Sequence, residues 1–80
     1  MRIQILAFGI AKDIIKGSTL ELELEEGATV GKVKQCLYRD YPELEKLASL
    51  RIAVNSEYAE AGQLLAEGDE VVLIPPVSGG

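Results

Sequence analysis

The 80-residue sequence predicts a single α+β domain in which a mixed sheet of four or five strands packs on one main helix. Segments typical of strands lie near both ends of the chain, one with clean two-residue alternation and the last a short apolar run, and one longer segment with helical spacing lies between them. The chain is 48% hydrophobic, which is enough for one core. We expect the domain to span 1–74 and an extended tail to span 75–80.

The first two strands are expected at 2–8 and 19–25. In the first, one side carries apolar residues only: Ile3, Ile5 and Ala7. The second alternates most cleanly, with inward leucines and outward glutamates: Leu20, Leu22 and Leu24 against Glu21, Glu23 and Glu25. The mixed stretch 9–16 indicates a helical turn, and Gly17-Ser18 marks the turn before the second strand.

The main helix is expected to follow a loop at 26–28. Thr29 can cap it by accepting a hydrogen bond from a backbone amide of its first turn. A narrow apolar stripe then recurs at helical spacing: Val30, Val33, Leu37 and Tyr41. The helix should end by Tyr41, because a proline follows.

The remainder of the chain predicts short elements. A helical turn at 42–47 would bring Leu44 and Leu47 to the core, and a strand at 50–54 follows. Further along, turn residues at 55–57, a short segment at 63–66 and a turn at 67–69 precede a last strand at 70–74.

Composition excludes several classes of function. Thirteen acidic and eight basic residues give a net charge of −5, which would repel phosphate backbones, so we expect no nucleic-acid partner. No apolar run approaches 18 residues, so we expect no membrane span and a cytoplasmic protein. The absence of histidine removes the commonest metal ligand and general base, so we expect no metal site and no self-contained catalysis. The glutamates at 21, 23, 25 and 26 form a solvated strand face, which could also dock on a basic partner.

The C-terminus carries the most informative motif. The last strand runs into Pro75-Pro76-Val77-Ser78 and ends in Gly79-Gly80. Proline restricts its own φ and keeps its predecessor extended, so the tail should project, by roughly 20 Å if fully extended. Gly80 offers a bare carboxyl group, and Gly79 lets the backbone pass where a Cβ would not fit.

Several motifs together resemble the family of small, sulfur-carrier subunits of molybdopterin synthase. They are Phe8-Gly9 with Lys12-Asp13, Ala28-Thr29-Val30, Tyr41-Pro42-Glu43-Leu44, Ala53-Val54-Asn55, Asp69-Glu70-Val71 and Pro75-Pro76-Val77-Ser78-Gly79-Gly80. The resemblance spans the whole chain, and its most specific part is the ending. Family members often carry Arg-Glu where this chain has Lys12-Asp13, so the order of charges is kept.

The resemblance implies the ubiquitin-like β-grasp fold and a chemistry centred on Gly80. An adenylating enzyme would activate the terminal carboxylate with ATP, and sulfur would displace AMP to leave a thiocarboxylate. The large synthase subunit would accept the tail and transfer sulfur to cyclic pyranopterin monophosphate, with two carriers flanking a dimeric large subunit. The chain itself would be a non-catalytic carrier that binds no cofactor.

The same resemblance suggests an interface with the large subunit. Phe8, Tyr58 and Ile74 match apolar family positions that meet that subunit, and 75–78 would enter it. The other interpretation of these three residues is ordinary core. Cys36 could relay sulfur, but we expect a partly buried helix residue and assign it no role; Lys32, Lys34 and Arg39 are expected on the solvated face of the helix.

Two further interpretations remain open. The chain could be a carrier for another pathway, such as thiazole or thionucleoside synthesis, or a ubiquitin-like modifier conjugated to lysines. It could also be a non-covalent β-grasp interaction module whose terminal glycines are incidental. The extended lead-in before Gly79-Gly80 argues against this last interpretation.

Overall fold

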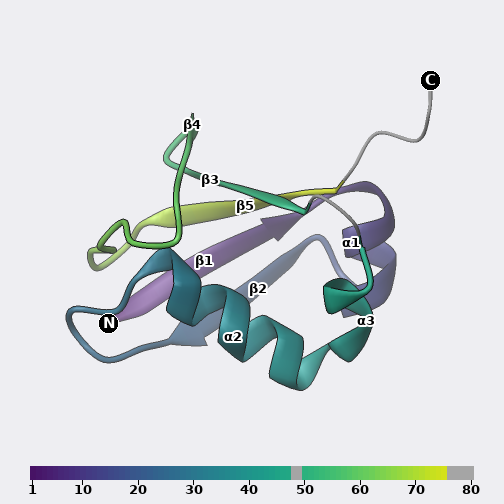
Figure 1. Ribbon diagram of the computed structural model, residues 1–80, viewed down its shortest axis with the longest axis horizontal. Coiled ribbons are helices and arrows are strands. Elements are labelled where there is room, and N and C mark those ends of the chain that lie inside the picture. Colours follow the sequence, from purple (N-terminus) through teal and green to yellow (C-terminus); the bar gives the residue numbers. More distant parts are fainter. Residues whose placement is uncertain (48–49, 76–80) are drawn as a thin grey trace.

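The computed structural model describes residues 1–47 and 50–75. The elements in chain order are β1 (Arg2–Ala7), α1 (Gly9–Ile15), β2 (Thr19–Glu23), α2 (Val30–Asp40), α3 (Pro42–Glu45), β3 (Arg51–Val54), β4 (Glu57–Tyr58) and β5 (Glu70–Ile74). The strands form one sheet in the order β2-β1-β5-β3-β4, with α2 lying across one face (Figure 1). β1 and β5 are parallel, and the other neighbouring strands are antiparallel. This is the β-grasp fold that the sequence predicts.

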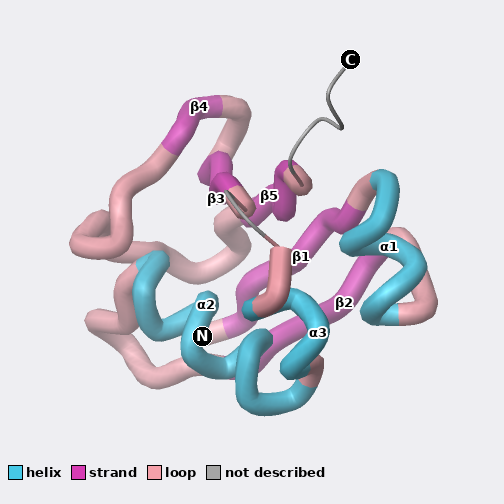
Figure 2. The backbone as a smooth tube through the Cα atoms, turned by 45° about the vertical axis from the view of Figure 1, so that its right-hand side comes forward, coloured by secondary structure: helices cyan, strands magenta, loops and turns pink. Residues whose placement is uncertain are grey.

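The core lies between the sheet and the helices. The neighbouring strands β1 and β5, together with α2, supply side chains that are at most 1% exposed: Ile3, Ile5, Ala7, Val71, Leu73, Val30, Val33 and Leu37. α3 lies next to the C-terminal end of α2 (Figure 2) and adds the fully buried Leu44 to the core. The predicted apolar stripe of the main helix is therefore confirmed, with Tyr41 partly buried at its end.

The start of α2 is held by a side chain and by a distant loop. Thr29 caps the helix as predicted, because its hydroxyl accepts a hydrogen bond from the Lys32 amide at 3.3 Å. The amides of Val30 and Gly31 donate to the carbonyls of Gln63 and Ala61, at 3.0 and 2.8 Å. Together these contacts satisfy backbone donors that a helix start otherwise leaves open.

The stretch 9–16 forms more structure than the single turn that its composition indicates. α1 has seven residues, and Ala11 and Ile15, four positions apart, are buried on one side of it. Lys16 ends the helix in the left-handed conformation, with φ 61°. Tertiary packing of two apolar positions thus extends a helix that local preference alone does not predict.

The strand β4 is absent from the sequence-based prediction, which assigned Glu57 to a turn. The turn consists of Asn55 and Ser56 alone, with φ values of 50° and 75°. Two residues of positive φ make a tight hairpin, which returns Glu57 and Tyr58 antiparallel to β3. The first two strands are also shorter than predicted, ending at Ala7 and Glu23.

No helix in the described ranges is long and apolar enough to cross a membrane.

Candidate functional site

The sheet face that points away from α2 carries an apolar row across four strands. Leu6 pairs with Val72, Val72 with Ala53, and Ala53 with Tyr58. Directly paired residues point to the same side of a sheet, so these four side chains share one face. Leu6 and Val72 are half-buried, and Tyr58 is 63% exposed. We call this side of the sheet the open face.

Phe8 and Ile74 extend the open face at one end. β1 and β5 run parallel with Ala7 paired to Leu73, so the residues that follow, Phe8 and Ile74, lie at the same end of the sheet. Phe8 is 56% exposed and Ile74 is half-buried. Phe8 and Tyr58 are therefore not core residues, and the three residues singled out from the sequence belong to one surface.

The ring of Tyr58 makes a cation–π contact with Arg51. The Arg51 guanidinium lies over it, 4.1 Å from the ring centroid, an arrangement in which the positive charge meets the negative face of the π-system. Arg51 pairs with Ile74 across the sheet, so it lies at the same end of the open face. A shallow hollow beside the ring is lined by Ala53, Ser56, Tyr58, Val72 and Ile74. This arrangement offers an apolar contact surface with one positive group.

The tail leaves the sheet next to this surface. Pro75, the last residue described, is half-buried and packs against Gly9: a Cβ on Gly9 would lie 3.4 Å from Cγ of Pro75. Gly9 also has a φ of 56°, which side-chain-bearing residues rarely adopt. Pro75 therefore begins the tail beside Phe8 and Ile74. The other tail residues assigned a role from the sequence, Pro76, Val77, Ser78, Gly79 and Gly80, lie outside the described residues.

Two residues of this site were given no role from the sequence. Arg51 has no local signal, because its place over Tyr58 depends on the β3–β4 pairing. Gly9 could have been found as a glycine directly after a strand, which often marks a positive φ or a close backbone approach.

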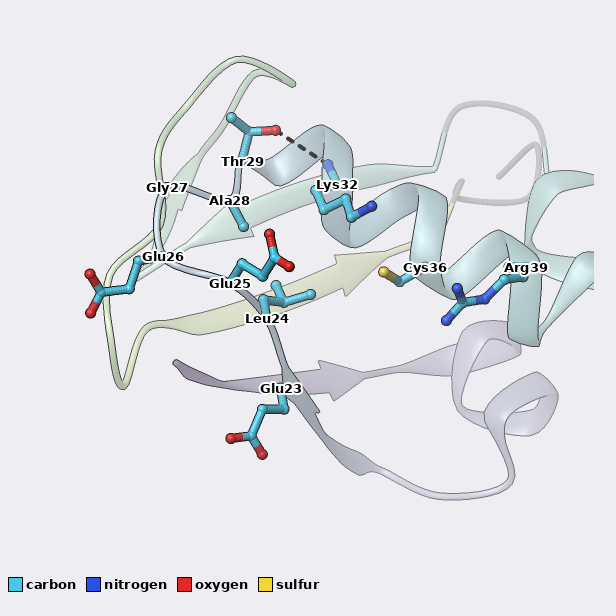
Figure 3. A pocket seen from close by; sticks show the side chains of 10 residues that line it. All are labelled: Glu23, Leu24, Glu25, Glu26, Gly27, Ala28, Thr29, Lys32, Cys36 and Arg39. Atoms are coloured by element: carbon cyan, nitrogen blue, oxygen red, sulfur yellow. Dashed lines mark hydrogen bonds between the residues drawn. The ribbon is translucent and has the colours of Figure 1, made fainter.

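A second hollow lies on the helix side, between the loop after β2 and α2 (Figure 3). It contains the sulfur of Cys36, with Lys32 and Arg39 from the same helix. Cys36 is partly buried, as predicted, and Lys32 and Arg39 are exposed, whereas Lys34 is half-buried. Glu23 and Glu26 point away from the helix in this view. Within 1–47 and 50–75, no three His, Cys, Asp or Glu side chains are grouped to hold a metal ion.

Comparison with known sequences gives one family. A model described as the ThiS family matches residues 5–80. The molybdopterin synthase sulfur carrier subunit of Arabidopsis thaliana is 32% identical over 81 residues, covering 100% of this chain and 84% of that protein.

Comparison with solved structures gives the same fold. SAMP1 from Haloferax volcanii superimposes with a TM-score of 0.88 at 28% identity, with 100% of both chains covered. A chain from the complex of subunits 1 and 2 of molybdopterin-converting factor from Helicobacter pylori superimposes with a TM-score of 0.72 at 25% identity, again with 100% of both chains covered.

Proposed function

The chain belongs to the ThiS family, and we propose that it is the sulfur carrier of molybdopterin synthase, loaded with sulfur at Gly80. The observation that carries the proposal is the union of two features at one end of the molecule. The Gly-Gly tail starts at Pro75, beside exposed Phe8 and half-buried Ile74, and exposed Tyr58 lines the same hollow as Ile74. A partner that covers this surface also receives the tail.

The chemistry follows from the terminal carboxylate. A carboxylate is a poor electrophile, so it needs a leaving group before sulfur can attack. In the proposed sequence, an adenylating enzyme joins the Gly80 carboxylate to AMP and releases pyrophosphate from ATP. A sulfur nucleophile then attacks the carbonyl carbon and AMP leaves, which yields a thiocarboxylate. Gly80 has no side chain to hinder that attack.

The large synthase subunit then supplies the active site. Its active site would take Pro76, Val77, Ser78 and Gly79 as an extended strand and position the thiocarboxylate sulfur for transfer to cyclic pyranopterin monophosphate. The chain itself contributes no acid, base or cofactor, and ATP is bound by the adenylating enzyme. We place this exchange in the cytoplasm, in a heterotetramer of two carriers and two large subunits.

The open face gives the large subunit its binding surface in this proposal. Exposed aromatic side chains are enriched in protein interfaces, and a contiguous exposed apolar patch often marks one. Likeness to a chain of the two-subunit Helicobacter pylori complex supports this assignment.

Mass spectrometry of the intact chain tests the proposal. After incubation with an adenylating enzyme, ATP and a sulfur source, we expect one oxygen of the C-terminus to be replaced by sulfur. Adding the large subunit and cyclic pyranopterin monophosphate should then consume the thiocarboxylate and form the dithiolene. Loading without discharge to the pterin would contradict the molybdenum cofactor assignment and leave a carrier of another pathway.

A ubiquitin-like modifier is the second candidate, favoured by the likeness to Haloferax volcanii SAMP1 over the whole chain. A modifier would join Gly80 to a lysine amine through an isopeptide bond. Isopeptide-linked adducts of this chain, found by peptide mass spectrometry of cells that express it, would support this second function. Their absence where free thiocarboxylate accumulates would support the first.

A further inference from the structure

We infer that Arg51 is a specificity-determining residue of the open face, and that two N–H groups of its guanidinium bind a carboxylate of the large synthase subunit. The inference rests on the proposed function, because it names the chemistry that the partner must bring to the same surface.

The open face is polarised in charge. At the end far from the tail, Glu21 pairs with Gln4 and Gln4 with Glu70, while Arg2 lies 4.0 Å from Glu21 in an ion pair. At the tail end, most of the described strand residues on this face are apolar, and Arg51 carries a positive charge among them. A partner side chain that enters here meets one positive charge among apolar neighbours.

The Arg51 guanidinium stacks on a neighbouring ring, and in the described part of the chain its N–H donors have no side-chain partner. The guanidinium lies 4.1 Å from the Tyr58 ring centroid, and the residue is exposed. Among the described residues it makes no ion pair within 4.0 Å and no side-chain hydrogen bond. A guanidinium has five N–H donors in its plane, so stacking on a ring uses the face of the group and leaves the edge available.

A carboxylate is the partner group that fits this edge. Two parallel N–H donors match two carboxylate oxygens, and a lysine ammonium cannot reproduce that geometry. The ring of Tyr58 restrains the arginine before binding, which lowers the entropy lost when the ion pair forms. The hollow next to the ring would receive the apolar part of the same partner segment.

Binding titrations with the purified large subunit test the inference on the full-length chain. We expect Arg51→Leu to raise the Kd about tenfold or more, which corresponds to the loss of about 1.4 kcal/mol. Arg51→Lys should recover only part of this loss. Arg39→Leu is the matched control: it removes an exposed arginine from α2, on the opposite side of the sheet, that is already paired with Asp40, and its Kd should stay within about twofold of wild type.

Two further readouts separate a partner contact from a structural role. The melting temperature of Arg51→Leu should equal that of wild type, because the residue is exposed. The Kd of wild type should rise more steeply with salt than that of Arg51→Leu. An unchanged Kd for Arg51→Leu, or equal losses for Arg51→Leu and Arg39→Leu, would overturn the inference while wild-type binding upholds the proposed function. If the wild-type chain fails to bind the large subunit, the proposed function itself is overturned.

Discussion

The two faces of β5 carry the same kind of side chain but differ in how far those side chains are buried. Val71 and Leu73 are 0% exposed beneath α2, whereas Val72 and Ile74 on the open face are half-buried. The residue types on the two faces are nearly the same, so hydrophobicity alone does not distinguish residues that stabilise the fold from residues that bind a partner. The layer that covers each face makes the difference.

The position of β5 in the sheet sharpens this comparison. A central strand with apolar residues on both faces is typical of a sheet that is covered on both sides. β5 is central, between β1 and β3, and the described helices cover one side. In the proposed function the large subunit provides the other cover, so we expect the residues of the open face to affect binding more than folding.

The largest expected effect lies in the tail, where a side chain should abolish function without changing stability. Gly80→Val places a branched group next to the carbonyl that sulfur attacks. We expect the variant to fold normally and to gain no thiocarboxylate in the loading reaction, as read by intact mass.

Gly62→Val is the matched control for this substitution. Gly62 is exposed, and a Cβ there meets nothing within 4 Å, so this variant should load like wild type. Measurable thiocarboxylate on Gly80→Val would refute the steric argument for Gly80.

The next effect distinguishes the two faces of β5 by stability. Leu73→Ala removes a fully buried side chain and should lower the free energy of unfolding by about 2–5 kcal/mol in urea denaturation. Ile74→Ala, one residue later on the open face, should cost about 1 kcal/mol, because its side chain is only half-buried. Equal losses from the two variants would mean that the open face belongs to the core.

The same comparison predicts the reverse for binding. Tyr58→Asp places a carboxylate in an apolar contact surface and should raise the Kd for the large subunit about tenfold or more. Because Tyr58 is 63% exposed, the melting temperature should not fall. Tyr58→Phe keeps the ring beneath Arg51 and should bind nearly as wild type. A parallel loss of binding and melting temperature in Tyr58→Asp would favour a structural role.

Much of the fold was predictable because local patterns and the final packing agree. The alternation at Thr19–Glu23 and the stripe of α2 follow from the period of their apolar residues, and the strand Glu70–Ile74 follows from a short continuous apolar run. β4 was not predictable in this way. It contains two residues, too few for a period, and its existence depends on the left-handed backbone of Asn55 and Ser56.

The parts of the candidate site that are marked by local sequence motifs were predictable. The parts that depend on how the strands pair were not. Phe8, Ile74 and the Gly-Gly ending are recognisable along the chain, and the β1–β5 pairing places Phe8 and Ile74 together. Arg51 and Tyr58 are seven positions apart and meet because the β3–β4 hairpin is tight. Sequence spacing does not predict that contact without the conformation of the turn.

The smallest expected effect concerns the helix that covers the buried face. Thr29→Ala removes the hydroxyl that accepts from the Lys32 amide, a change that typically costs about 1 kcal/mol. Here we expect about 0.5 kcal/mol, because the Lys32 amide also donates to the Thr29 carbonyl at 3.0 Å and the preceding two amides donate to Gln63 and Ala61. Thr29→Ser, which keeps an acceptor, should restore wild-type stability in urea denaturation. A loss above about 2 kcal/mol would show that the hydroxyl, and not the loop at 61–63, holds the start of α2.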